Sequence, residues 1–353
     1  MAFDFFPLLR PALLALDAER AHGLTIKALE AGIYPRPCGP DDMRLRQSLF
    51  GLDFPNPLGM AAGFDKDARV MQALLALGFG FAEVGTVTPL PQEGNPKPRL
   101  FRLPADGAVI NRMGFNNEGL DAVLPRLKAR PGRGIVGVNL GANKTSKDKI
   151  ADYVTGVRAV QELADYMVIN ISSPNTPGLR NLQAGAELDA LLGQVMAARH
   201  CQTPLLVKIA PDLDSRALHE IAAVIVAHGV DGVIVSNTTL SREGLRERAA
   251  AESGGMSGAP LFKLSTRILA RMYMETRGRV PLIGVGGISS GADAYDKIRA
   301  GASLVQLYTA LVYQGPGLIT RIKRELGALL EKNDIRTISQ VTGKDAEAIA
   351  QDI

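Results

Sequence analysis

Eight short apolar runs, rich in β-branched residues, recur along this chain of 353 residues and limit the folds open to it. Stretches with helical periodicity separate most of them. Runs of this kind are typical of parallel strands, because helices bury both faces of a parallel sheet. Eight is also the number of strands that closes a (β/α)8 barrel. The runs comprise residues 57–62, 81–86, 135–140, 167–172, 205–210, 232–237, 281–287 and 302–308.

We therefore expect an α/β fold in which a (β/α)8 TIM barrel occupies residues 48–333, with a doubly wound open sheet as the alternative. Residues 87–133 contain too many prolines and glycines for a helix, which predicts an excursion over the barrel mouth. Residues 34–47 are rich in proline and charge and predict a linker. Residues 334–353 have helical character and form a C-terminal tail without a functional interpretation.

Residues 1–33 predict a pair of short helices that meet near Leu16, with Asp17 as an N-cap and Gly32 as a C-terminal stop. The pair has more apolar surface than solvated helices need. It either caps the main domain or lies in a membrane interface. No stretch of 18 apolar residues predicts a spanning helix. No basic region precedes the apolar N-terminus, so a signal peptide is not expected.

Composition excludes several classes of function. The formal net charge is only +4 and no run of like charges occurs, so nucleic-acid binding is not expected. The chain has no Trp, which disfavours a stacking platform for single strands. Cys38 and Cys201 are the only cysteines, too few for a disulfide framework or a zinc site of cysteine pairs.

Active groups of a (β/α)8 barrel lie on the loops that follow its strands. Here those loops are polar and rich in amides, and they include Lys66 and Lys208 but neither His nor Cys. They also lack the carboxylate clusters that a metal or glycoside hydrolysis requires, so no metal is expected. Such groups suit a planar heterocycle together with an anion.

Two features indicate a bound phosphate and a delocalised ring. The glycine-rich residues 284–289 follow the seventh run and Tyr308 follows the eighth, where these barrels commonly hold phosphate. A tight turn that needs glycine only for its geometry is the simpler alternative. Lys208 lies within an apolar run, where an inward ammonium needs an anion or an electron-rich ring. The alternative is an outward lysine that reaches solvent.

The segment at residues 170–178, NISSPNTPG, follows the fourth run. It is either an ordinary turn or a loop that faces the barrel mouth. Without a histidine nearby, Ser173 cannot be the nucleophile of a catalytic triad. It could accept a proton if water relays that proton away.

Nine motifs in order resemble the dihydroorotate dehydrogenase family over residues 1 to about 325. The serine at 173 and the N-terminal helix pair resemble its membrane-associated, quinone-reducing class 2, whereas the soluble class carries a cysteine base and lacks the helix pair. The motifs are AAGFDK (61–66), EVGTVTP (83–89), NRMGFNN (111–117), NISSPNTPGLR (170–180), VKIAPDL (207–213), GVIVSNTT (232–239), GGMSGAPL (254–261), GVGGI (284–288) and GASLVQLYTAL (301–311).

The resemblance implies an FMN flavoprotein that oxidises (S)-dihydroorotate to orotate in de novo pyrimidine (UMP) biosynthesis. A membrane quinone, ubiquinone or menaquinone, is the implied terminal acceptor. The implied location is peripheral, on the cytoplasmic side of the bacterial inner membrane, and the implied state is a monomer.

The resemblance also assigns roles to residues. Ser173 is the implied base for the C5 proton, and we expect Thr176 and a trapped water to relay that proton onward. The implied substrate-binding residues are Lys66, Asn111, Arg112, Met113, Gly114, Phe115, Asn170, Asn175, Asn237 and Thr238. The implied FMN-binding residues are Ala62, Gly63, Phe64, Asp65, Lys66, Thr86, Asn139, Asn170, Lys208, Ser236, Gly258, Gly287, Tyr308 and Thr309. The implied quinone-site residues are His22, Arg102 and Tyr308.

Three positions depart from the bacterial pattern: Phe64 replaces Leu, Ser236 replaces Thr and Thr309 replaces Ser, each keeping size class or hydroxyl. Three alternative functions remain: the soluble class that reduces fumarate or NAD, an FMN-dependent reductase of tRNA uridines, and a flavin-binding scaffold without activity. The missing cysteine base disfavours the first two. The polar groups after every run disfavour the third.

Overall fold

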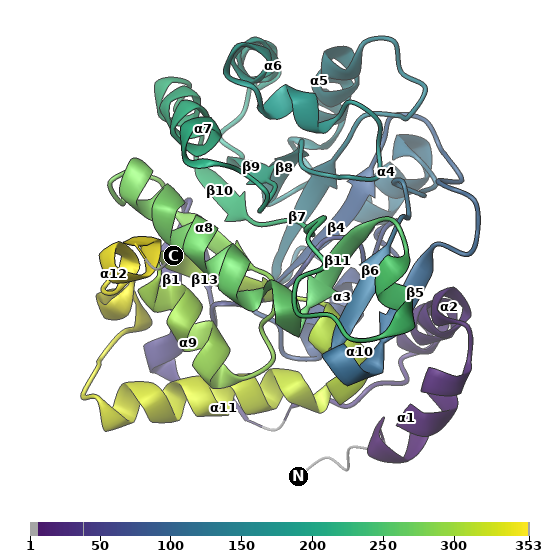
Figure 1. Cartoon of the computed structure of the whole chain (residues 1–353), viewed down its shortest axis with the longest axis vertical. Coiled ribbons are helices and arrows are strands. Elements are labelled where there is room, and N and C mark those ends of the chain that lie inside the picture. The colour runs from purple at the N-terminus through teal and green to yellow at the C-terminus, as the bar shows by residue number, and fades with distance from the viewer. Residues whose placement is uncertain (1–5, 38, 352–353) are drawn as a thin grey trace.

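The computed structural model describes residues 6–37 and 39–351, and its centre is a closed barrel of eight parallel strands (Figure 1). Each predicted run contributes one barrel strand, so the predicted (β/α)8 fold is confirmed. Around the barrel the order is β10, β12, β13, β3, β4, β7, β8, β9. The strands are β3 (Leu58–Met60), β4 (Phe81–Val87), β7 (Ile135–Leu140), β8 (Tyr166–Asn170), β9 (Leu205–Ile209), β10 (Gly232–Val235), β12 (Leu282–Val285) and β13 (Ala302–Leu307).

Helices surround the barrel and cover its outer face (Figure 1). Side chains that cap helix N-termini explain where several begin, since Asp148, Asp214 and Ser290 each accept a hydrogen bond from a backbone N–H of the first turn. The helices that follow β3 and later strands are α3 (Met71–Ala76), α4 (Leu120–Lys128), α5 (Lys149–Val160), α6 (Gly185–Ala198), α7 (Ser215–Ala227), α8 (Phe262–Glu275), α9 (Gly291–Arg299), α10 (Thr309–Gln314) and α11 (Gly317–Lys332).

Aromatic rings fill the barrel at the amino ends of its strands. A Cβ added at Gly59 would lie 2.3 Å from the ring of Phe81, and one at Gly137 would lie 2.1 Å from the ring of Tyr166. Glycine is therefore required at both positions. The hairpin of β1 (Gln47–Leu49) and β2 (Leu52–Phe54) adds Phe54, whose ring centroid lies 5.3 Å from that of Phe81. This end of the barrel is closed, so a ligand site belongs at the other end.

The excursion predicted at residues 87–133 contains a small antiparallel sheet. Its strands β5 (Leu100–Leu103) and β6 (Ala108–Asn111) pair with each other, and β6 pairs with β11 (Gly255–Gly258) from a distant part of the chain. The prediction that this region holds no helix was wrong, because α4 forms within it despite Pro125. Buried Leu120, Val123 and Leu127 give α4 an apolar face that stabilises it.

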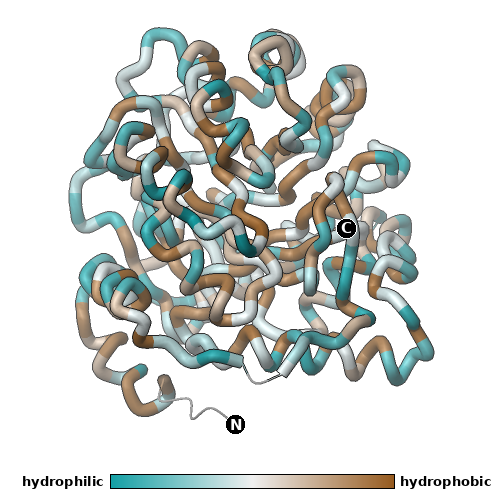
Figure 2. Tube along the Cα trace, turned by 180° about the vertical axis from the view of Figure 1, so that it is seen from behind, coloured by the Kyte–Doolittle hydropathy of each residue, from teal (hydrophilic) through white to brown (hydrophobic). Residues whose placement is uncertain are grey.

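The N-terminal segment forms two helices, α1 (Phe6–Ala15) and α2 (Ala18–Glu30), near α10 and β5 (Figure 1). Asp17 caps α2 as predicted, accepting a hydrogen bond from the backbone N–H of Arg20. Figure 2 shows that α1 is mostly hydrophobic, and none of its residues is buried. In the described part of the chain, no helix combines the length and apolar character needed to cross a membrane.

The C-terminal tail is folded onto the barrel. Helix α12 (Ala346–Gln351) packs against α8, and the Arg299 guanidinium pairs with Asp345 at 2.5 Å. The tail thereby covers the outer helical layer, away from the open end of the barrel. Short 3₁₀ turns occur at Met43–Leu45, Pro104–Asp106, Arg180–Gln183, Arg248–Ala251, Ala259–Leu261 and Ile338–Val341.

Candidate active site

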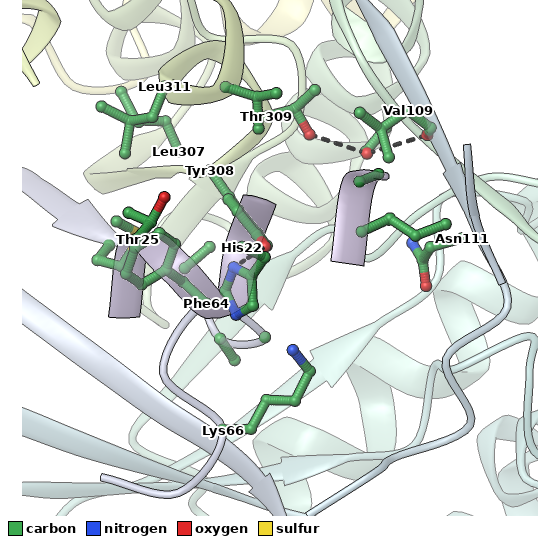
Figure 3. A pocket seen from close by; sticks show the side chains of 18 of the residues that line it. His22, Thr25, Phe64, Lys66, Val109, Asn111, Leu307, Tyr308, Thr309 and Leu311 are labelled. Atoms are coloured by element: carbon green, nitrogen blue, oxygen red, sulfur yellow. Dashed lines mark hydrogen bonds between the residues drawn. The ribbon is translucent and has the colours of Figure 1, made fainter. Parts of the chain in front are cut away.

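A cavity of about 950 Å³ lies at the carboxyl ends of the barrel strands. One part is lined by the polar loops that follow the strands, and the other by apolar residues of α1, α2 and α10. Figure 3 shows side chains from both parts facing the same space. The cavity therefore joins the barrel mouth to the N-terminal helix pair.

Most of the predicted site residues line this cavity. They come from the carboxyl ends of six barrel strands, the excursion, β11 and α2. Those that line it are His22, Ala62, Gly63, Phe64, Lys66, Thr86, Arg102, Asn111, Met113, Gly114, Phe115, Asn170, Ser173, Asn175, Lys208, Ser236, Asn237, Thr238, Gly258, Tyr308 and Thr309.

Five predicted residues are not among the lining residues. Asp65 turns away to accept hydrogen bonds from the backbone N–H groups of the following turn. Arg112 pairs with Glu252 at 2.7 Å instead of reaching the cavity. Asn139 and Thr176 are buried behind the lining, and Gly286 lines the cavity where Gly287 was expected.

Ser173 faces the cavity, whereas the adjacent Ser172 does not. The Ser172 hydroxyl is held by amide side chains, donating to Asn170 Oδ1 at 2.9 Å and accepting from Asn237 Nδ2 at 2.9 Å. Among the described residues, the Ser173 Oγ accepts a single hydrogen bond, from the backbone N–H of Asn175 at 3.2 Å. Its proton and second lone pair are therefore available to a ligand.

An arginine that the sequence reasoning missed holds this loop in place. The Arg180 guanidinium donates to the carbonyls of Ser172 and Thr238, each at 3.0 Å, and pairs with Asp212 at 2.8 Å. It thereby joins the loops that follow β8 and β10. Arg180 belongs to the motif at 170–180, but its sequence position alone did not indicate which groups it would contact.

Lys66 presents an ammonium to the cavity without a partner. No hydrogen bond or ion pair of its Nζ occurs among the residues that the structure describes. Burial lowers the pKa of Lys66 to about 8, while Asp67 opposes that shift. An anionic ligand group would offset this desolvation, so Lys66 fits an anion site.

Lys208 lines the cavity and belongs to a buried polar network centred on Glu83. Its Nζ is 3.9 Å from Glu83 Oε1, and burial lowers the pKa of Lys208 while Glu83 raises it. Glu83 also accepts hydrogen bonds from Asn139 at 2.7 Å and Gln306 at 2.6 Å. The inward orientation of Lys208 excludes the alternative of a lysine that reaches solvent, since only 5% of the residue is exposed.

Asn139 connects the Glu83 network to residues that line the cavity. Its Oδ1 accepts hydrogen bonds from Thr86 Oγ1 at 2.6 Å and from Asn170 Nδ2 at 3.0 Å. Both partners line the cavity. Asn139 therefore orients the lining residues from behind.

The loop after β12 places a glycine, and therefore exposed backbone atoms, at the cavity wall. Gly286 lines it with φ +112°, a conformation that L side chains rarely adopt. Across the cavity, the Thr309 hydroxyl donates to Ser257 Oγ at 2.9 Å, and both residues line the wall. Ser257 lines the cavity but was not among the residues predicted from the sequence. Exposed backbone and hydroxyl groups of this kind suit phosphate.

Three rings surround the apolar end of the cavity (Figure 3). Phe64 packs edge-on against both His22 and Tyr308, with ring centroids 5.3 and 5.5 Å apart. The Tyr308 hydroxyl and His22 Nδ1 are 3.3 Å apart. Burial, aided by the charge of Lys66, lowers the pKa of His22 to about 3. His22 is therefore a neutral hydrogen-bonding group at physiological pH.

Arg102 connects the helix pair to the excursion sheet. Its guanidinium donates to the carbonyl of Leu13 at 2.9 Å and to that of Leu16. These contacts satisfy the end of α1 while the side chain still lines the cavity. Arg102 thus both positions α1 and gives the apolar end a positive charge.

Comparisons with known proteins agree with this geometry. The family model described as dihydroorotate dehydrogenase matches residues 44–330. The chain belongs to the dihydroorotate dehydrogenase family. A relative from Parvibaculum lavamentivorans, named dihydroorotate dehydrogenase (quinone), is 58% identical over 97% of this chain and 99% of its own. One from Azorhizobium caulinodans with the same name is 54% identical, with the same coverage.

A solved structure extends the similarity to three dimensions. The dihydroorotate dehydrogenase of Eimeria tenella, in complex with ferulenol, matches with a TM-score of 0.91 and 41% identity. The match covers 96% of this chain and 98% of that one. Similarity to quinone-class members of the dihydroorotate dehydrogenase family thus spans the helix pair as well as the barrel.

Cys201 takes no part in the site. Cys201 lies outside the cavity lining, and its thiol donates to the Gln161 carbonyl at 3.3 Å. Cys38 lies outside the described residues. No cluster of three or more metal-ligating side chains occurs among the described residues either.

We predict that His22 remains neutral down to well below its ordinary pKa of 6.5. Between pH 6.5 and about 3 the unfolded state then binds a proton that the folded state does not, so this group makes the free energy of unfolding fall as the pH falls. Heteronuclear NMR of the imidazole nitrogens measures its titration, and the resonance is assigned by its loss in His22→Leu. A midpoint at or above about pH 6 contradicts the prediction.

Proposed function

We propose that this chain oxidises (S)-dihydroorotate to orotate, with FMN as hydride acceptor and a membrane quinone as terminal acceptor, in de novo pyrimidine (UMP) biosynthesis. One observation carries the proposal: a single cavity joins amide- and lysine-rich loops to an apolar passage under the N-terminal helices. Membership of the dihydroorotate dehydrogenase family supplies the reaction, and the names of the relatives supply the quinone.

The residues present fit FMN. Lys208 offers a buried ammonium that suits the electron-rich edge of a flavin, and Thr86 and Asn170 offer fixed polar groups beside it. Gly258, Gly286 and Thr309 suit the phosphate. When bound, FMN supplies the acceptor for the C6 hydride of the substrate. The remaining proposed FMN contacts are Ala62, Gly63, Phe64, Asp65, Lys66, Asn139, Ser236, Gly287 and Tyr308, of which Asp65, Asn139 and Gly287 act from behind the lining.

Amide side chains from three loops are proposed to hold the substrate ring. Asn175 Nδ2 donates to the Asn111 carbonyl at 3.2 Å, which fixes two of them relative to each other. Asn237 is fixed by Ser172, and Lys66 meets the substrate carboxylate. Residues 111–115 close one side of the site. Arg112 contributes through its position in this loop, since its guanidinium is paired with Glu252.

Ser173 is proposed to remove the C5 proton. An unperturbed serine hydroxyl is a weak base, so the proton must be passed on as it is transferred. Thr176 suits the relay, because its hydroxyl is buried and has no hydrogen-bond partner in the described structure. A water between the two hydroxyls would complete the path, and the buried loop excludes bulk solvent from it.

The quinone is proposed to reach FMN between α1 and α2, near His22, Arg102 and Tyr308. These helices expose large apolar side chains: Leu8 is 74% exposed, Leu9 56% and Leu24 51%. A peripheral position on the cytoplasmic side of the bacterial inner membrane would bury them. Residues 1–33 therefore form the membrane and quinone unit, residues 34–47 the linker, residues 48–333 the FMN barrel and residues 334–353 a tail. We propose a monomer.

The choice of electron acceptor tests the function directly. We expect the purified protein to be yellow and to bleach anaerobically when dihydroorotate is added. Steady-state turnover should then be sustained by a short-tailed quinone and not by fumarate or NAD. Efficient turnover with fumarate or NAD would instead assign the chain to the soluble class, and absence of bound flavin would end the proposal.

Substitution of Ser173 tests the base. Ser173→Ala should slow flavin reduction by dihydroorotate by about 10²-fold or more, because general-base catalysis is lost. Ser173→Cys should retain more activity at high pH, because a thiol ionises nearer neutrality than a hydroxyl. Anaerobic stopped-flow absorbance measures both rates. A wild-type rate in Ser173→Ala rules out the assignment.

Deletion of residues 1–33 separates the two half-reactions. We expect the truncated protein to keep flavin reduction by dihydroorotate and to lose reoxidation by quinone, because the apolar wall of the cavity is removed. Rapid mixing with each reactant in turn measures the two steps. If both steps are lost together, the helices serve the fold and the proposed quinone passage is wrong.

A further inference from the structure

Lys297 is a fully buried lysine without a carboxylate partner. It lies on α9, its exposed fraction is 0%, and its Nζ donates to the hydroxyl of Ser265 at 2.6 Å. The ring of Phe262 lies 5.1 Å away. No ion pair of Lys297 occurs in the part of the chain that the structure describes. The nearest acidic influence is Asp293, one turn earlier on α9, which is engaged by Ser289.

The other buried lysines differ in this respect. Lys208 lies 3.9 Å from Glu83, and Lys323 lies 2.5 Å from Asp41 and donates to the Gly78 carbonyl at 2.8 Å. A buried ammonium that meets only a hydroxyl and an aromatic ring is costly. Burial lowers the pKa of Lys297 well below its ordinary range. Among the described residues only Asp293 opposes this shift, so a phosphate near Lys297 would favour its charged form.

The contacts of Lys297 lead to the cavity wall. The Ser265 Oγ that accepts its proton lies 3.1 Å from the Gly286 carbonyl, and Gly286 lines the cavity. A Cβ added at Gly286 would lie only 2.8 Å from Ser265 Oγ, so no other side chain fits between them. The stem of Lys297 runs along Gly284 of β12, with its Cβ 3.5 Å from a Cβ built there. One layer of atoms thus separates the ammonium from the glycine loop.

The charge of Lys297 can act on a ligand across this layer because the intervening groups are buried away from water. The attraction between opposite charges in a protein interior exceeds that in water several-fold at the same distance. Phe262, the first residue of α8, packs against the same loop. Its backbone nitrogen would lie 2.7 Å from a Cβ built at Gly287. A phosphate on the cavity side of the loop would meet the field of an ammonium held behind it.

We propose that Lys297 is a positioning residue for the flavin phosphate, which it attracts from behind the glycine loop through Ser265 and Gly286 without touching it. The inference rests on the proposed function, because it requires FMN at this loop. It assigns a binding role to a residue outside the cavity. It also predicts a preference for FMN over riboflavin, which has the same ring system but no phosphate.

The test is equilibrium binding of FMN and riboflavin to the full-length protein, with free flavin measured by fluorescence after ultrafiltration. Lys297→Met, which keeps the length and removes the charge, should weaken FMN binding by about tenfold or more and leave riboflavin binding unchanged. Its thermal unfolding temperature without flavin should not fall, because an apolar side chain of similar length replaces an amine that is costly to bury. Lys297→Gln keeps a donor for Ser265 without the charge, and it should lose the preference for FMN as Lys297→Met does.

Lys323→Met is the matched control, since it removes a buried lysine that already has a carboxylate partner. It should lower the unfolding temperature and leave the ratio of FMN to riboflavin affinity unchanged. Equal weakening of both flavins in Lys297→Met, or a wild-type ratio in Lys297→Gln, would show a structural role and overturn the inference. If the wild-type protein binds neither flavin, the proposed function itself fails, which is a different result from a wild-type ratio in the variants.

Discussion

The carboxylate of Glu83 is the constraint on which the arrangement of the barrel mouth depends. It is completely buried, and a buried charge is tolerated only when it is hydrogen-bonded and paired. Asn139, Gln306 and Lys208 from three other strands meet that need. Each is thereby held facing inward, so one acidic residue fixes polar groups that point toward the cavity from around the barrel.

The two halves of the site follow different physical rules. Hydrogen bonds from Asn139 to Thr86 and Asn170 make the polar floor rigid, which suits a flat ring that must be held at a fixed distance from its substrate. The apolar half is built from exposed helices and three packed rings, with few hydrogen bonds. Such an apolar wall suits the hydrophobic quinone that we propose as the terminal acceptor.

The fold was predictable because its signal is periodic. Every buried strand of the barrel leaves an apolar run, and the strand-end loops are where such barrels place ligands. The direction of a side chain within a loop leaves no such signal, so Asp65 and Asn139 were expected at the cavity but lie behind it. Helix α4 was missed because Pro125 outweighed an apolar face that only tertiary packing completes. Glu83 and Lys297 were overlooked because a buried charge is recognised by its partners, which are distant in sequence.

The buried lysines of this protein differ in whether a carboxylate lies close to them. Lys208 and Glu83 compensate each other inside the barrel, and Lys323 and Asp41 do so outside it. Within the described residues, Lys66 faces the cavity without an ion-pair partner, and Lys297 lies behind the glycine loop bonded to the hydroxyl of Ser265. Two lysines are thus placed where a ligand would carry its anionic groups, and burial disfavours their charged form in the unliganded protein. An anionic ligand would offset this cost, so affinity and stability become linked through these two lysines.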